Sequence, residues 1–212
     1  MSRGASPSWT RLALGVAGAS VTLAVALALR GAVNIWLATG AFAAISLPLL
    51  LALWGPAARR ALRPRPRRLL WGAVAGVALA AASHLLHPLA CALVPSLEPA
   101  VRGLYAELAA PPGPVAALPV LGVVVLTEEL AWRGPLLERL AGRLGEAGGL
   151  AAHLAVYTAP QLVSASPVLI ALALGCGLVW GALRLRLGGM DAAFACHLVW
   201  AVLVFVAFPV TA

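Results

Sequence analysis

Two adjacent glutamates, Glu128 and Glu129, interrupt an apolar stretch of this chain, and Arg133 follows them within LTEELAWRG. A carboxylate inside a membrane costs roughly 2.5–3.5 kcal/mol to insert, so its presence there indicates a function. Glu129 and Arg133 are four residues apart, which on a helix places them on one face as an ion pair. Glu128 points about 100° away around the helix axis and has no such partner. The spacing predicts that Arg133 holds Glu129, while Glu128 is a candidate general base.

For the polar residues within apolar segments, a purely structural explanation must be considered as well as a functional one. The Glu129–Arg133 pair alone is also compatible with a boundary ion pair that only anchors its helix. His84 and His87 share a helical face, where they line a site or cap a kink near Pro88. Asp191 opens the last apolar segment, where a carboxylate favours a helix N-terminus.

The composition places the whole chain in a membrane. It is 62% hydrophobic and only 10% charged, with a mean hydropathy of +0.97, whereas a soluble domain carries roughly 25% charged residues. All fifteen basic residues behind the net charge of +8 are arginines, and most of them lie in short loops. Such arginines set topology and contact lipid headgroups, so we expect the lipid bilayer as a partner and no nucleic acid. The three cysteines form no CxxC pair and are expected to be small buried residues.

The apolar runs predict an all-α polytopic helix bundle that forms one integral membrane domain over 1–212. A helix needs about 20 apolar residues to span a bilayer. Seven candidate spans meet this need, and the first is interpreted as a retained helix rather than a signal peptide. They lie at about 12–29, 32–54, 69–94, 115–133, 148–165, 167–183 and 190–209. Residues 135–145 fit an additional interfacial helix, because leucines and charges fall on different faces.

The distribution of arginines predicts the orientation. Segment 55–68 holds six of them, which marks it as cytoplasmic by the positive-inside rule. Alternation through seven spans then places the N-terminus inside and the C-terminus outside. The alanine-rich, lysine-free usage is typical of a high-GC bacterial genome. We therefore expect the bacterial inner membrane as the location.

The motif E-E-x-x-x-R-G, from Glu128 to Gly134, closely resembles the first motif of the CPBP intramembrane proteases. This family includes the Rce1-like CAAX prenyl endopeptidases and the bacterial Abi proteins. The later landmarks follow in family order. GCGLVWGALRLRLGGM resembles the glycine-rich sixth-span region, with Gly177 and Gly181 spaced for close helix contact. AFACHLVWA resembles the third motif through His197, so the family-like core covers about 80–210.

The resemblance implies a proteolytic mechanism. The first motif-one glutamate, here Glu128, would activate a water for attack on a peptide carbonyl, assisted by a histidine in the following span. His197 would help to bind the oxyanion. Zinc was once assumed for the family, but glutamate-type catalysis is the current interpretation. No HExxH is present here, so no cofactor or metal is expected.

The chain departs from the family pattern at two motifs. The second, F-x-x-x-H, falls on Tyr157 and Gln161, and glutamine can hold a water but cannot take its proton. The third lacks its last polar partner at Ala201. His153, four residues before Tyr157, is a candidate substitute. We expect an intramembrane endopeptidase that cleaves a membrane-anchored protein or peptide near the cytoplasmic face. The alternative is a weakened or inactive relative that acts as a membrane binding or immunity protein.

Overall fold

The computed structural model describes residues 7–210, which form helices and connecting turns without a β-strand. The helical elements begin with α1 (Trp9–Ala28), α2 (Ile35–Trp54), α3 (Pro56–Ala61), α4 (Pro66–Leu93), α5 (Leu97–Leu108) and α6 (Leu118–Glu128). They continue with the π-helical turn η1 (Glu129–Arg133), α7 (Pro135–Thr158), the 3-10 turn η2 (Ala159–Ser164), α8 (Pro167–Leu187), α9 (Met190–Val202) and the π-helical turn η3 (Leu203–Ala207). The predicted all-α bundle is confirmed.

Within residues 7–210, five helical segments are long and apolar enough to cross a membrane: α1, α2, α4, α8 and α9 with η3. This confirms an integral membrane protein. The predicted fourth span is shorter than expected, since α6 starts at Leu118 and continues only through η1. The predicted interfacial helix and fifth span are joined in α7, which is broken at Gly145 by a φ of 74°. Only glycine adopts this left-handed conformation readily.

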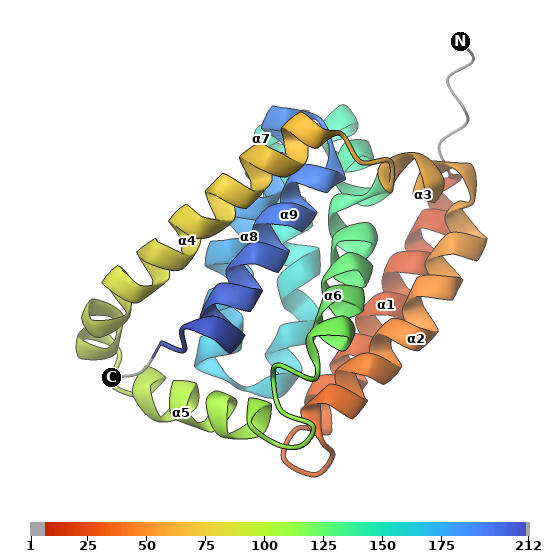
Figure 1. Ribbon diagram of the computed structural model, residues 1–212. Helices are drawn as coiled ribbons and strands as arrows, with labels where there is room; N and C mark the ends of the chain where they lie inside the picture. The colour runs from red at the N-terminus through yellow and green to blue at the C-terminus, as the bar shows by residue number, and fades with distance from the viewer. Residues whose placement is uncertain (1–6, 211–212) are drawn as a thin grey trace.

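Helix α9 is the centre of the bundle. It packs against α4, α8 and α6, while α1 packs against α2, and α2 against α6 (Figure 1). Helix α4 covers α9 from outside and presents a largely exposed apolar surface that includes Leu70, Val74, Leu85 and Leu89. An exposed apolar surface of this kind is stable against lipid chains rather than water.

Glycines let helices approach α9 and α7 closely. A Cβ atom at Gly72 of α4 would lie 2.2 Å from the carbonyl oxygen of Ala192 in α9. On α8, a Cβ atom at Gly181 would lie 2.5 Å from Leu150 Cδ1, and one at Gly177 would lie 3.0 Å from the Tyr157 ring. The predicted close helix contact through Gly177 and Gly181 is therefore present, and it seats α8 against α7.

Two helices were not predicted. Helix α3 lies within the arginine-rich segment 55–68 and begins with Pro56 at its first turn. Helix α5 crosses the opposite end of the bundle, where it buries Leu104 and Leu108 (Figure 1). Helix α4 runs through Pro88 to Leu93, which agrees with the predicted span 69–94. The arginine-rich segment and α5 therefore lie at opposite ends of the bundle.

Candidate functional site

Helix α6 ends at Glu128, and η1 begins at Glu129, so the two glutamates lie where these elements meet at the arginine-rich end of the bundle. The helix widens into a π-helical turn at Glu129–Arg133 and then ends at Gly134. A Cβ atom at Gly134 would lie only 2.3 Å from the carbonyl oxygen of Leu130, so a residue with a side chain would disturb this turn. Pro135 then starts α7, a position where its missing N–H costs nothing. The sequence Gly-Pro therefore fixes where the glutamate-bearing segment stops.

Glu129 is fully buried and is held on two sides. Its Oε1 lies 3.4 Å from an Arg133 guanidinium nitrogen, so the ion pair expected from their spacing is present despite the π-helical geometry. The same oxygen lies 2.9 Å from Nδ1 of His197 on α9. A carboxylate accepts hydrogen bonds, so Nδ1–H is the donor in this contact. Glu129 therefore joins η1 to α9.

Arg133 is also fully buried, with its guanidinium carbon 3.8 Å above the centroid of the Tyr157 ring and 5.2 Å from that of Trp180. Within residues 7–210, its three guanidinium nitrogens make no hydrogen bond that meets normal geometry. The aromatic faces and the Glu129 carboxylate therefore compensate its charge. Its backbone carbonyl accepts a hydrogen bond of 3.0 Å from Nε of Arg184.

Within residues 7–210, Glu128 forms no ion pair with Arg133 or His197, as expected from the helix geometry. The hydroxyl of Tyr157 donates a hydrogen bond of 3.0 Å to its Oε2. Tyr157 also packs edge-on against Trp132, with centroids 5.3 Å apart. The residue was recognised in the sequence only as a departure from the family phenylalanine. Its hydroxyl is thus a functional group that the pattern alone did not reveal.

A cavity of about 150 Å³ receives Glu128, Gln161 and His197 together, with Tyr157 and Trp180 also in its wall. One water occupies about 30 Å³ of liquid, so several waters fit. Most of the remaining wall is apolar and includes Ala201, the position where the family has a polar residue. The cavity continues towards the α5 end, where Arg30, Trp36, Leu104 and Leu108 line it.

His197 is buried and has a fixed ring orientation. Its ring stacks on Trp180, with centroids 3.5 Å apart and an angle of 16° between the planes. The stacking and the bond to Glu129 together hold the imidazole in the cavity wall. Trp180 is a second site residue that was not predicted from the sequence. The sequence places it four residues after Cys176 on α8, a spacing that by itself carries no signal of chemistry.

The remaining polar residues lie apart from this cavity. His153 is buried behind Tyr157, whose ring it stacks on at 6.2 Å, and it is absent from the cavity wall. His87 contacts Cys91 on α4 at 3.4 Å, and neither His84 nor His87 lines this cavity. Asp191 lies in the first turn of α9, as expected, and accepts a hydrogen bond from the Arg65 backbone. The structure thus brings Gln161 into the site rather than His153.

The donor set does not resemble a metal site. Within residues 7–210, no group of three or more histidine, cysteine, aspartate or glutamate side chains is arranged to hold a metal ion.

A comparison with models of known protein families gives a match to part of the chain. A family model described as type II CAAX prenyl endopeptidase Rce1-like matches residues 110–203. The matched segment contains Glu128, Glu129, Arg133, Gln161 and His197. No curated protein and no solved structure matches the chain. The family match confirms that this integral membrane protein resembles, through residues 110–203, the Rce1-like CAAX prenyl endopeptidases.

Proposed function

We propose that this protein is an intramembrane endopeptidase in which Glu128 activates a water that attacks a peptide bond. The observation that carries the proposal is the shared cavity of Glu128, Gln161 and His197. A general base, a water-holding amide and an imidazole beside a water-sized space are the groups that peptide hydrolysis needs. The family match supports a membrane protease of the CAAX-protease type.

In the proposed reaction, Glu128 removes a proton from the water as the water oxygen attacks the carbonyl carbon. The Tyr157 hydroxyl occupies Oε2, which leaves Oε1 to face a water. The Gln161 amide can orient that water by a hydrogen bond. When the C–N bond breaks, the proton passes from Glu128 to the leaving nitrogen. No covalent bond to the protein and no redox partner are needed.

His197 is proposed to stabilise the oxyanion. Glu129 accepts the Nδ1–H bond, so Nε2 is the ring nitrogen left for a substrate oxygen, and it donates to that oxygen only when it also carries a proton. One well-placed donor to an oxyanion contributes about 3 kcal/mol of transition-state stabilisation. Glu129 and Arg133 act here as positioning residues, because their contacts hold the imidazole and η1 rather than the substrate.

The apolar wall favours a hydrophobic, membrane-associated protein or peptide as the substrate. The cavity is lined by leucines and valines that include Leu121, Val124 and Leu169. Burial of an apolar substrate segment against this wall is favourable, whereas a charged segment would lose its hydration. The position of Glu128 at the arginine-rich end supports cleavage near the cytoplasmic face.

A second candidate function is peptide binding without cleavage. It is favoured by Gln161 and Ala201, which both line the cavity and supply no group that transfers a proton. Under this alternative, the cavity still holds an apolar peptide segment, and Glu128 serves only as a hydrogen-bond acceptor. The two candidates therefore differ in whether Glu128 is needed for turnover or only for binding.

The decisive test is the Glu128→Gln variant, expressed in cells that lack the wild-type chain. Glutamine keeps the shape and the Tyr157 contact but cannot accept the water proton. We expect uncut membrane-anchored precursors to accumulate, as measured by quantitative proteomics of the membrane fraction. The matched control is Glu146→Gln, at an exposed position on α7 outside the cavity, which should process precursors normally. Normal processing of precursors in cells that carry Glu128→Gln would contradict the proposed endopeptidase activity. Peptide binding without cleavage would then be the remaining candidate function.

A further inference from the structure

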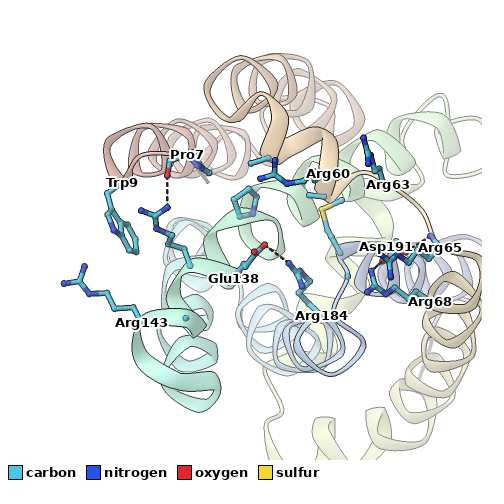
Figure 2. Close-up of a pocket in the computed structure, with 18 residues that line it drawn as sticks. Pro7, Trp9, Arg60, Arg63, Arg65, Arg68, Glu138, Arg143, Arg184 and Asp191 are labelled. Atoms are coloured by element: carbon cyan, nitrogen blue, oxygen red, sulfur yellow. Dashed lines mark hydrogen bonds and ion pairs between the residues drawn. The ribbon is translucent and has the colours of Figure 1, made fainter. Parts of the chain in front are cut away.

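Arginines from four parts of the chain gather around a second hollow, of about 670 Å³, at the end of the bundle nearest η1 (Figure 2). They come from α3, from the segment that leads into α4 together with the first turn of α4, from the start of α7 and from the end of α8. Those that line the hollow are Arg60, Arg63, Arg65, Arg68, Arg139, Arg143 and Arg184. Trp9 forms part of the opposite wall.

The hollow carries a charge that its own residues do not neutralise. Its seven arginines face two carboxylates, Glu138 and Asp191, which leaves an excess of five positive charges. Both carboxylates are already engaged, since Glu138 pairs with Arg184 at 3.2 Å and Asp191 with Arg68 at 3.8 Å. The uncompensated charge therefore belongs to the other arginines.

Five of these arginines have no acidic partner among residues 7–210, and three of the five also lie over no aromatic ring there: Arg60, Arg63 and Arg65. All three are exposed. Arg139 is engaged differently, because it donates a hydrogen bond of 3.0 Å to the Pro7 carbonyl and lies over the Trp9 ring. Guanidinium groups that line one hollow without an acidic partner can bind an oxyanion by charge-assisted hydrogen bonds.

The wall next to Asp191 is shaped by two glycines. Gly188 has a φ of 68°, and the Gly188–Gly189 turn joins α8 to α9. A Cβ atom at Gly189 would lie 2.2 Å from Asp191 Oδ1 and 2.3 Å from an Arg68 guanidinium nitrogen. A side chain at residue 189 would displace the ends of Asp191 and Arg68, so Gly189 favours the close approach of this pair.

A topology signal alone does not require this arrangement. The positive-inside rule depends on how many arginines a loop carries and not on where their side chains point. Arg59 and Arg67 belong to the same segment as Arg60 and Arg63 and are equally exposed, yet they do not line the hollow. The pair Arg59 and Arg67 carries the same charge as the pair Arg60 and Arg63. Comparing variants of the two pairs therefore distinguishes an effect of total charge from an effect of a specific binding site.

We propose that the hollow formed by Arg60, Arg63, Arg65 and the Arg68–Asp191 pair binds the phosphate group of an anionic headgroup ligand. The planar guanidinium fork matches phosphate geometry, and basic pockets between membrane helices hold anionic lipid headgroups. A hollow of about 670 Å³ accommodates a glycerophosphate headgroup. The site is separate from the Glu128 cavity and does not depend on the proposed protease activity.

The test uses the purified full chain in a neutral detergent, titrated with dioctanoyl phosphatidylglycerol and with dioctanoyl phosphatidylcholine. The choline ammonium cancels the headgroup charge and would face the arginines. We expect the phosphatidylglycerol to bind about tenfold more tightly, and the double variant Arg60→Gln with Arg63→Gln to remove about that factor. Equal binding of the two lipids would overturn the proposal.

The matched control is Arg59→Gln with Arg67→Gln, which removes the same charge from the same segment. It should bind phosphatidylglycerol like the wild type. Equal weakening by both double variants would show a diffuse charge effect and would also overturn the proposal. Because all four residues are exposed, thermal unfolding should be unchanged and serves as the check on folding. Inorganic phosphate, titrated on its own, distinguishes the source: binding as tight as that of phosphatidylglycerol identifies a soluble phosphate as the ligand, and much weaker binding identifies the lipid.

Discussion

The Glu129 carboxylate lies 2.9 Å from Nδ1 of His197, although the two residues are 68 positions apart in the chain. The same carboxylate oxygen lies 3.4 Å from Arg133, so one buried acid fastens the imidazole and the end of the glutamate-bearing helix together. Glu128, its neighbour, takes no part in this cluster and contacts Tyr157 instead. Adjacent glutamates therefore have separate tasks, and variants at each should differ in what they impair.

Removal of Arg133 should destabilise the protein because Glu129 would remain buried with only His197 as its partner. We expect Arg133→Met to cost about 3–5 kcal/mol, seen as a lower apparent Tm in detergent. Combining it with Glu129→Gln removes the uncompensated acid and should recover part of the loss. A double variant whose loss equals the sum of the two single losses would contradict this coupling.

Tyr157→Phe should slow turnover while leaving the fold intact. The ring still packs on Trp132 and beneath Arg133, and only the hydrogen bond to Glu128 is lost. A hydrogen bond to a charged group contributes about 1.5 kcal/mol, so we expect kcat to fall about tenfold with little change in KM. The measurement is cleavage of the precursor identified with Glu128→Gln. Unchanged kcat would mean that Tyr157 does not orient the general base.

The control for this variant is Tyr105→Phe. The Tyr105 hydroxyl donates to the Val204 carbonyl and accepts from the Val210 backbone N–H, both at 2.8 Å. Burial raises the pKa of the Tyr105 phenol, so the group stays a donor at neutral pH. Loss of the Tyr105 hydroxyl should lower the Tm and leave kcat unchanged. The comparison with Tyr157→Phe therefore distinguishes an effect on folding stability from an effect on the site.

The sequence was sufficient to predict the membrane bundle and one contact of the site. Long apolar runs predict spanning helices because insertion depends on local composition, and the pairing of Glu129 with Arg133 depends only on helical spacing. The short helix α5 was missed, although Leu97, Val101, Leu104 and Leu108 recur at helical spacing. The stretch is simply less apolar than the spans around it.

Contacts between distant segments were beyond the reach of local patterns. The bond from Glu129 to His197 and the stacking of His197 on Trp180 depend on how α8 and α9 pack around η1. The π-helical turn itself depends on the tight end at Gly134. The Tyr157 hydroxyl appeared in the sequence as a departure from the family motif, and only its contact with Glu128 gives it a role.

Gly72→Ala should loosen the packing of α4 on α9. The new methyl group would lie 2.2 Å from the Ala192 carbonyl oxygen, which belongs to the backbone and cannot move aside alone. We expect a loss of about 1–3 kcal/mol, measured as a lower Tm. The matched control is Gly175→Ala on α8, where nothing lies within 4 Å of the added atom. Equal Tm values for the two variants would show that α4 does not approach α9 this closely.

Gln161→His introduces the histidine of the F-x-x-x-H motif found in the CPBP family, which this chain resembles, and should raise turnover. Gln161 already lines the cavity with Glu128, so an imidazole there can accept a proton that the amide cannot. Acid–base groups contribute about 100-fold or more when well placed, and we expect at least a tenfold gain in kcat. Gln161→Leu, which removes hydrogen bonding at similar volume, should instead lower kcat. The gain should vanish when Gln161→His is combined with Glu128→Gln, because both groups act on one water. A histidine variant no faster than the leucine variant would show that residue 161 does not contact that water.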